Sequence, residues 1–394
     1  MAAPHPRYVL DPVALTGAVT ALVSCLALPL AQLRSSRLAL AGEPHRALEA
    51  GPFGVAAVAL ALAAVAVALV GRPALRRLLA QLDATALAVA LAWAFGAAVT
   101  RLAAQAPPIA RVSPGVGFWV ALAGAAALAF AGRDAAPASR PWRSLALGAV
   151  ALAGFAAAAA YGGLAQVSIG REYAVRSDVF WQLAAQHLAL AGAGLAGGVL
   201  IGVPLGIAAT RRPRLRALAL GVTGILETVP SLALLGLLIA PLAALAAAYP
   251  SLEAAGVGGI GPAPALIALV TYALLPVVRG TYVALDSVDF ALVDAGRGMG
   301  MSRVQLFARV ELPLALPLVI EGVRVAAVLL IGITTVTAFV GEGGFGALIF
   351  QGVGQNAPDL ILLGALPVIV LAVVADYGLR AVASLATPRG VGAA

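Results

Sequence analysis

The residues with the strongest potential for chemistry form a short polar segment, Glu227–Ser231 (ETVPS), inside an apolar run from about 217 to 241. Glu227 lies about ten residues into this run, which corresponds to roughly 15 Å along a helix and to the middle of a bilayer. An ionisable group at that depth costs at least about 2–3 kcal/mol unless it faces a cavity or a charged partner. The position of Glu227 therefore indicates a polar pathway through the membrane.

Pro230 interrupts the helical hydrogen bonding of the same segment, because a proline has no N–H to donate to the carbonyl of Leu226. The hydroxyl groups of Thr228 and Ser231 are near enough in sequence to compensate locally. Irregular backbone at membrane depth is tolerated only against protein or water. We therefore predict that a broken helix lines the pathway at Thr228, Pro230 and Ser231; the alternative is a satisfied structural kink.

The ionisable residues exclude most kinds of catalysis. All 25 cationic side chains are arginine, and the absence of lysine excludes a Walker A phosphate loop and Schiff-base chemistry. One cysteine and three scattered histidines are too few for an intrachain disulfide or a zinc cluster, and the apolar runs hold no cluster typical of a membrane-embedded enzyme. Aromatic residues make up 6%, which argues against a platform for nucleic-acid bases. We expect no catalytic residue, no metal site and no nucleic-acid partner.

The composition predicts the elements that position these residues. Of 394 residues, 62% are hydrophobic and 11% are charged, and the mean hydropathy is +1.01. Soluble chains carry about 25% charged residues, so the solvent of this chain must be largely lipid. A membrane-spanning helix needs about 20 apolar residues. Ten such runs fall at about 12–33, 53–70, 84–100, 115–132, 145–165, 188–210, 217–241, 264–279, 318–340 and 360–376.

These runs are continuous and rich in Ala and Leu rather than alternating, which disfavours strands. We predict an all-α, polytopic membrane protein with about ten transmembrane helices. The first run could also be a signal peptide, because Leu22–Cys25 resembles a lipoprotein cleavage box. The apolar run continues past Cys25 to Leu33, however, whereas a cleavage site should close it. An uncleaved first span is therefore expected.

The distribution of arginine predicts the orientation, since cytoplasmic loops hold an excess of cations. With the N-terminus inside, seventeen of the 25 arginines fall in inner segments and Arg324 lies within a span. The last two outer loops, 242–263 and 341–359, contain no arginine. We therefore expect both termini in the cytoplasm. The seven arginines of the outer loops are Arg34, Arg37, Arg46, Arg101, Arg111, Arg171 and Arg176.

The two halves of the chain differ in polar content. The predicted spans of residues 1–165 contain no ionisable group, which is typical of a scaffold or accessory bundle. The stretch 166–187 mixes charged and aromatic residues and is interpreted as interfacial, with His187 at the interface. In the second half, the glycines of span six are expected to serve close helix packing. Glu321 and Arg324 lie three apart and should form a structural ion pair.

The longest predicted inner connection, 280–317, has the pattern of two short helices. Asp286 and Ser287 offer an N-cap for the first helix, and the glycines between 296 and 300 interrupt it. Ser302–Gln305 (SRVQ) matches a capping box for the second helix. Both helices are too short and too charged to span a membrane.

Pro313 and Pro317 are expected to end the second short helix. Both short helices carry an exposed apolar stripe, which favours a docking element for another protein. The alternative is an interfacial pair of helices that rests on lipid.

Three motifs, which follow one another along the chain in the expected order, carry a resemblance. Asp294–Ser302 (DAGRGMGMS), continued by Val310–Pro317 (VELPLALP), resembles the EAA loop of ABC-importer permeases. Glu227–Gly236 (ETVPSLALLG) and Ala338–Gly346 (AFVGEGGFG) resemble the osmoprotectant branch, the glycine betaine, choline and carnitine permeases. The similarity covers roughly 175–385. It implies a C-terminal five-span type I ABC-importer permease core, 171–385, preceded by an accessory bundle, 1–170, and followed by a short cytoplasmic tail, 386–394.

The resemblance also implies site residues. The acidic residue of the family motif corresponds to Asp294, its two alanines to Ala295 and Gly296, and its glycine to Gly300. Asp for Glu shortens the carboxylate arm, and Gly for the second Ala loosens the helix. The ATPase-docking loop is expected at Asp294, Ala295, Gly296, Gly300, Met301, Ser302, Leu312 and Pro313. The translocation pathway or gate is expected at Glu227, Thr228, Pro230, Ser231, Tyr272, Phe339, Gly341, Gly343 and Gly344, with Tyr272 and Phe339 as aromatic walls for a quaternary ammonium group.

The partners follow from the same resemblance. A cytoplasmic ABC ATPase should use the ATP, so this chain binds no cofactor and is not itself an enzyme. A second permease copy or a paralogue should complete the pathway, and an extracytoplasmic solute-binding protein should deliver a small osmoprotectant. The rival hypothesis is an ion-coupled secondary carrier with a 5+5 inverted repeat. The first half, however, has no broken helix to match 227–231, and a carrier has no need of the loop 286–317.

Overall fold

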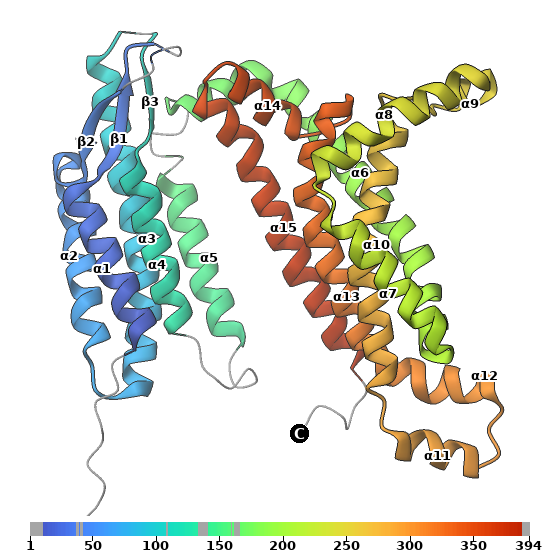
Figure 1. Cartoon of the computed structure of the whole chain (residues 1–394). Coiled ribbons are helices and arrows are strands. Elements are labelled where there is room, and N and C mark those ends of the chain that lie inside the picture. The colour runs from blue at the N-terminus through green and yellow to red at the C-terminus, as the bar shows by residue number, and fades with distance from the viewer. Residues whose placement is uncertain are drawn as a thin grey trace, which may run out of the picture. The chain divides into compact units, whose positions relative to one another are not determined.

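The computed structural model is mostly helical (Figure 1). It describes residues 11–36, 39, 42–107, 109–132, 141–158, 160 and 166–387. Contacts divide the chain into two compact units, Met1–Val175 with Gln355–Asp359, and Arg176–Gly354 with Leu360–Ala394. Of the arginines used to predict the orientation, Arg7, Arg37, Arg133, Arg140 and Arg389 lie outside the described residues, as does the predicted tail from residue 388 onward.

The first unit is a helical bundle with an alanine-rich core. Small residues let its helices approach closely: a Cβ atom at Gly17 of the first helix would lie 2.8 Å from the carbonyl oxygen of Gly124 in the fourth. Asp11 caps the first helix by accepting the Val13 N–H at 3.0 Å. The helices are α1 (Pro12–Ala27), α2 (Pro52–Ala68), α3 (Pro73–Gln105), α4 (Val116–Ala131) and α5 (Pro141–Ala158).

A small antiparallel sheet at one end of this bundle was not predicted (Figure 1). It consists of β1 (Pro29–Arg34), β2 (Glu43–Arg46) and β3 (Arg111–Pro114) in the order β2-β1-β3. The predicted first span, 12–33, is wrong in its second half, because the helix ends at Ala27 and β1 begins two residues later. Leu28 precedes a proline and takes extended angles, φ −100° and ψ 152°, which stop the helix.

The third helix also departs from the prediction. The run 84–100 was expected to form a span without ionisable groups, but α3 begins at Pro73 and includes Asp83. Hydropathy locates only the apolar part of a helix, whereas the backbone stays helical through the preceding polar turns. Arg76 and Arg77, two of the seventeen arginines counted in inner segments, lie in these first turns.

The second unit holds the longer helices. Helix α6 begins in the first unit and continues into the second through a kink at Arg176 (φ −125°, ψ 21°). The helices are α6 (Ser168–Arg211), α7 (Pro213–Thr228), α8 (Ser231–Ala248), α9 (Pro250–Ala254), α10 (Pro262–Asp286), α11 (Phe290–Gly298), α12 (Arg303–Leu306), α13 (Leu312–Ile333), α14 (Gly346–Gly354) and α15 (Pro358–Ala386). A π-helical turn, Phe307–Glu311, joins α12 to α13, and a 3-10 helix, Thr334–Val340, follows α13.

Six helices of the described residues are long and apolar enough to cross a membrane: α3, α6, α8, α10, the α12–α13 segment and α15. Helices α1, α2 and α4 and the part of α5 from Leu147 are apolar but shorter. A helix of 16 residues, such as α1, spans about 24 Å, against about 30 Å of hydrocarbon. The polytopic all-helical class is thus confirmed, and the number of ten spans stays a prediction.

Glycines bring the helices of the second unit together, as predicted for span six. Cβ atoms at Gly194 and Gly202 of α6 would lie 2.6 Å and 2.8 Å from the side chains of Leu269 and Val277 on α10. Helices α10 and α13 cross at Gly280 and Gly322 with similarly close backbones. Helix α10 is therefore clamped between α6 and α13 and forms the centre of the unit.

Candidate functional site

The run 217–241 forms two separate helices, as predicted. Helix α7 ends at Thr228, Val229 is extended (φ −68°, ψ 125°), and α8 starts at Ser231. The Leu226 carbonyl accepts the Val229 N–H at 3.3 Å, so the backbone itself replaces the bond that Pro230 removes. The hydroxyl of Thr228 donates to the Ile225 carbonyl at 2.7 Å. The break is thus a satisfied feature that redirects the chain, in agreement with the rule for irregular backbone at membrane depth.

Tyr272 supports this break from behind. Its side chain is buried in the core around α10, and its hydroxyl donates to the Val229 carbonyl. The structure therefore places Tyr272 under the break rather than on an open surface. Glu227, Thr228 and Pro230 are exposed, and Ser231 is half-buried. The polar segment is presented outward while a tyrosine holds its backbone.

A glycine-rich turn follows the 3-10 helix Thr334–Val340. Gly341 and Gly344 have positive φ values of 85° and 46°, which L side chains rarely adopt. A Cβ atom at Gly344 would lie 2.5 Å from the Cβ of His187 on α6. Gly343 packs equally tightly on Ala338. This turn requires glycine because its backbone touches α6 directly.

His187 was predicted at the interface, and this is wrong. Its side chain is fully buried, with 0% exposure, and Nε2 lies 3.0 Å from the Ile331 carbonyl oxygen. The His187 ring also packs on Phe345, with centroids 5.5 Å apart. The neighbouring Gln186 donates from Nε2 to a carboxylate oxygen of Glu342. The apolar run begins next to His187, but α6 starts nineteen residues earlier, so its neighbours in sequence gave no indication of burial.

Phe339 is the exposed aromatic residue of this region. It lies at the end of the 3-10 helix and contacts Phe350 of α14 edge to face, with ring centroids 5.0 Å apart. Its exposed ring stands two residues before Gly341, the first glycine of the turn. A flat aromatic face of this kind can bind a quaternary ammonium group.

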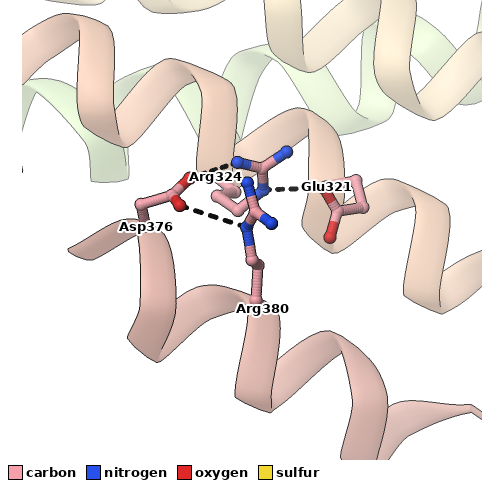
Figure 2. Close-up of polar contacts among 4 residues, drawn as sticks. All are labelled: Glu321, Arg324, Asp376 and Arg380. Carbon is pink, nitrogen blue, oxygen red and sulfur yellow. Dashed lines mark hydrogen bonds and ion pairs between the residues drawn. The ribbon is translucent and has the colours of Figure 1, made fainter. Parts of the chain in front are cut away.

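A charged network connects α13 to α15 (Figure 2). Arg324 donates from Nε to Glu321 at 2.6 Å, as predicted, and from Nη1 to Asp376. Arg380 lies 3.1 Å from the second oxygen of Asp376. The Asp376 and Arg380 contacts were not predicted, because these residues lie on a different helix. Four charges with no net charge thus form a polar contact between two membrane-spanning helices.

The loop 280–317 forms two short helices, as predicted. Helix α11 has Asp289 as its N-cap, which accepts the Ala291 N–H at 2.8 Å. The predicted cap at Asp286 and Ser287 is wrong, because α10 continues through Asp286. The capping box of the second helix is confirmed: Ser302 accepts the Gln305 N–H, and Gln305 Oε1 accepts the Ser302 N–H at 2.9 Å.

The two short helices present an apolar surface to solvent. Phe290, Met299 and Val304 are each about 70% exposed or more. Asp294, Ala295 and Ser302 are also exposed, and Met301 is half-buried. Gly300 has φ 76° and turns the chain between the helices, and Gly296 is buried against Leu306. The Arg297 guanidinium lies 5.9 Å from the centroid of the Phe290 ring, and the apolar side chains remain open to solvent in the part of the chain that the structure describes. An exposed apolar surface of this kind suits a docking element.

Pro313 and Pro317 do not end the second helix, contrary to the prediction. The helix continues from Arg303 to Ile333 through the π-helical turn Phe307–Glu311. Pro313 falls in the first turn of α13, where a missing N–H is tolerated. The widened π-helical turn before it absorbs the change in hydrogen bonding. Leu312 and Pro313 therefore lie on a continuous helix that joins the short helices to a membrane span.

Glu311 and Arg211 form a link that the sequence did not reveal. Glu311 is 7% exposed and accepts both terminal nitrogens of Arg211, the last residue of α6, one of them at 3.3 Å. The Arg211 guanidinium lies 5.8 Å from the centroid of the Phe307 ring. Glu311 was part of the motif Val310–Pro317, but its partner is 100 residues away. The pair fixes α6 to the π-helical turn.

This arrangement defines a class of protein: a helical, multi-pass membrane protein. One of its helices is broken, and a loop of two short helices is attached to a membrane span by a continuous helix. The model of the binding-protein-dependent transport system inner membrane component matches residues 198–386. The model of the N-terminal domain of the ABC transporter permease YehY matches residues 10–170. The chain belongs to the family of binding-protein-dependent transport system inner membrane components, the permease subunits of ABC importers.

Similar proteins cover the second half of the chain. The chain is 38% identical over 206 residues to the carnitine transport permease protein OpuCB of Listeria monocytogenes, which is 52% of this chain and 87% of that protein. It is 40% identical over 207 residues to the osmoprotectant import permease protein OsmW of Salmonella typhimurium, 52% and 91% of the two chains. A solved inward-facing structure of the MetNI methionine ABC transporter is 22% identical, with a TM-score of 0.46, over 54% of this chain and 99% of that chain.

Membership of the family answers several predictions. The chain is the permease subunit of an ATP-driven importer and not a secondary carrier. It is not an enzyme, because the ATPase is a separate subunit. Permease subunits of this kind bind no cofactor themselves, and the family implies an ATPase and a substrate-binding protein as partners. The protein is a multi-pass inner-membrane protein.

Proposed function

We propose that this chain forms the pathway by which a small osmoprotectant, such as glycine betaine, choline or carnitine, crosses the membrane. The observation that carries the proposal is the similarity to permeases named for these solutes. They include the choline permease protein OpuBB of Bacillus subtilis, 38% identical over 82% of its length. The motifs Glu227–Gly236 and Ala338–Gly346 lie outside the ATPase-docking loop. They also resemble the osmoprotectant branch of the permeases.

The pathway runs, in this proposal, along the exposed side of the break and the glycine turn. Glu227, Thr228, Pro230 and Ser231 supply polar groups on one side. Phe339, Gly341, Gly343 and Gly344 form the gate, in which the aromatic ring meets the quaternary ammonium group. Tyr272 does not face the pathway in this proposal; its hydroxyl holds the Val229 carbonyl from the core of the unit.

The coupling segment, Phe290–Glu311 with the start of α13, is the proposed dock for the ATPase. Asp294, Ala295 and Ser302 are on its exposed surface, and Gly300 makes its turn. Both termini and this segment lie in the cytoplasm in the proposed orientation. ATP is bound and hydrolysed by the partner, and force reaches the membrane through Leu312 and Pro313 on α13. Residues 171–385 form the core in this proposal, and residues 1–170 form an accessory bundle.

One permease core cannot enclose a pathway, so we propose a pair formed by a second copy or by a paralogue. The α7–α8 surface suits this role. Ile225 and Leu237 are exposed to 69% and 67%, on either side of the break. Apolar side chains beside an exposed carboxylate would cover each other in the pair and leave Glu227 to face the lumen.

Uptake into proteoliposomes tests the proposed function. The permease is reconstituted with its ATPase and its solute-binding protein, and accumulation of labelled glycine betaine, choline, carnitine and methionine is measured. We expect ATP-dependent accumulation of at least one quaternary ammonium solute and none of methionine. Accumulation of methionine alone would contradict the osmoprotectant assignment while leaving the importer class intact.

Glu227→Gln should lower transport if this carboxylate faces the solute. Loss of one charge–cation interaction of about 1–2 kcal/mol corresponds to a roughly 5- to 30-fold fall in uptake at limiting solute. Initial uptake rates over a range of binding-protein concentrations measure it, with the amount of permease in the membrane as reference. The matched control is Glu253→Gln, the same chemical change at an exposed carboxylate of α9. Wild-type kinetics in Glu227→Gln would assign the residue to the structural kink.

A further inference from the structure

Three arginines of the predicted outer loops lie on the small sheet of the first unit. Arg34 lies on β1, Arg46 on β2 and Arg111 on β3. In the proposed orientation this end is extracytoplasmic, where cations are disfavoured. The outer loops of the permease core, 242–263 and 341–359, have no arginine. Arg34, Arg46 and Arg111, called the basic cluster here, thus belong to the accessory bundle. Their predicted position outside the cell is contrary to the general excess of cations in cytoplasmic loops.

Two of these arginines are held side by side. In the antiparallel pair β1–β3, Arg34 is the register partner of Arg111, so both side chains project from the same face of the sheet. Like charges directly opposite each other destabilise a sheet. The fold therefore maintains a costly arrangement that a bound anion would relieve.

Neither arginine forms an ion pair with a carboxylate among the residues that the structure describes. The Nε atoms of Arg34 and Arg111 are buried without a hydrogen-bond partner. Glu43 is the register partner of Leu33 and therefore projects from the other face of the sheet. Glu49 is engaged by His45 at 3.0 Å. The connecting segment 35–42 contains neither Asp nor Glu.

Exposed apolar side chains surround the cluster and indicate a lipid surface. Ile109, two residues before Arg111, is 67% exposed, and Leu48, two residues after Arg46, is 50% exposed. The strands directly follow α1 and precede α4, so the sheet stands where these apolar helices leave the bilayer. Apolar groups beside arginine heads are typical of the membrane interface, where the guanidinium reaches the phosphate layer.

We propose that Arg34 and Arg111 bind the phosphate group of an anionic phospholipid at the outer surface of the membrane. Guanidinium groups bind phosphate oxygens in pairs of hydrogen bonds, and two adjacent guanidinium groups suit one phosphate. The accessory bundle would thereby anchor the permease to anionic lipid. The proposal rests on the proposed orientation of the chain and is independent of which solute is carried.

Lipid binding by the full-length permease complex tests the proposal. The complex is placed in nanodiscs of phosphatidylcholine with increasing phosphatidylglycerol, and bound phosphatidylglycerol is counted by native mass spectrometry after release. We expect R34Q/R111Q to bind phosphatidylglycerol roughly 10- to 30-fold more weakly than the wild type, as the loss of two lipid-facing cations predicts. The control R212Q/R214Q removes two exposed arginines at the junction of α6 and α7 and should keep this outer-leaflet binding.

Three further measurements separate the alternatives. Inorganic phosphate that binds the wild type equally well in pure phosphatidylcholine would show a site for a free anion and overturn the lipid assignment. Unchanged lipid binding in R34Q/R111Q, with weaker association of the solute-binding protein, would assign the face to that protein instead. Labelling of Ser35→Cys in a Cys25→Ser background by an impermeant thiol reagent from the outside supports the orientation, and labelling only from the cytoplasm contradicts it.

Discussion

Glu311→Ala should uncouple this permease from its ATPase and lower uptake by roughly tenfold or more. Glu311 is buried and accepts both terminal nitrogens of Arg211, so its removal leaves a cation facing the Phe307 ring without its carboxylate. Truncating one partner of such a pair costs up to about 3–5 kcal/mol when both are buried, and less here because half of the Arg211 side chain is exposed. The cost falls on the π-helical turn that carries the coupling segment.

The effect should reach the gate because α6 has contacts at both ends of the permease core. Arg211 ends α6 at the coupling segment, while Gln186 and His187 of the same helix contact the glycine turn at Glu342 and Gly344. A movement of the coupling segment therefore has two rigid routes into the membrane, through α13 and through α6. Without the Arg211–Glu311 pair the α6 route loses its charged contact and keeps only the apolar packing of Val203 and Ile207 in the cluster that contains Phe307.

The measurement is the ratio of ATP hydrolysed to solute accumulated in proteoliposomes. In Glu311→Ala we expect ATPase activity to persist while uptake falls, and the charge reversal R211E/E311R to recover part of the uptake. Arg309→Gln is the matched control, since Arg309 is an exposed charge in the same turn. An unchanged ratio in Glu311→Ala, or an equal loss in Arg309→Gln, would remove the link through α6.

The features that the sequence predicted correctly depend on near neighbours. The capping box at Ser302 involves residues three apart, and the break at Pro230 follows from a missing N–H and an extended preceding residue. The Glu321–Arg324 pair is likewise one helical turn. The broad class followed from composition, because a chain with so few charges cannot cover its apolar surface in water.

The missed features depend on residues that are distant in sequence. His187 is buried by Ile331 and the Gly344 backbone, and the Ile331 contact is 144 residues away. The sheet pairs β1, most of which fell within the predicted first span, with β3 in a loop about 80 residues later. Pro313 looked like a helix terminus because a π-helical turn cannot be recognised from residue types. Tertiary contacts decided each of these cases.

Arg324→Leu should destabilise the permease core, because it leaves two carboxylates in a membrane span with one arginine. Arg324 contacts both Glu321 and Asp376, and its side chain is 19% exposed (Figure 2). Glu321, Asp376 and Arg380 then carry a net negative charge between α13 and α15. An unbalanced carboxylate at this depth costs about 2–4 kcal/mol. The ion pair is also a direct polar link between these two helices.

Comparison of three variants distinguishes the effect of an unbalanced charge from the effect of a lost contact between α13 and α15. We expect Arg324→Leu to lower the Tm of the detergent-purified complex by roughly 4–16 °C, as this cost implies for a unit of about 200 residues. R324L/D376L removes both partners and leaves Glu321 and Arg380 with no net charge, so it should be more stable than the single variant. Arg380→Leu, at a side chain that is 56% exposed, should change the Tm little. A double variant no more stable than Arg324→Leu would mean that the contact between α13 and α15, rather than the charge balance, stabilises this part of the core.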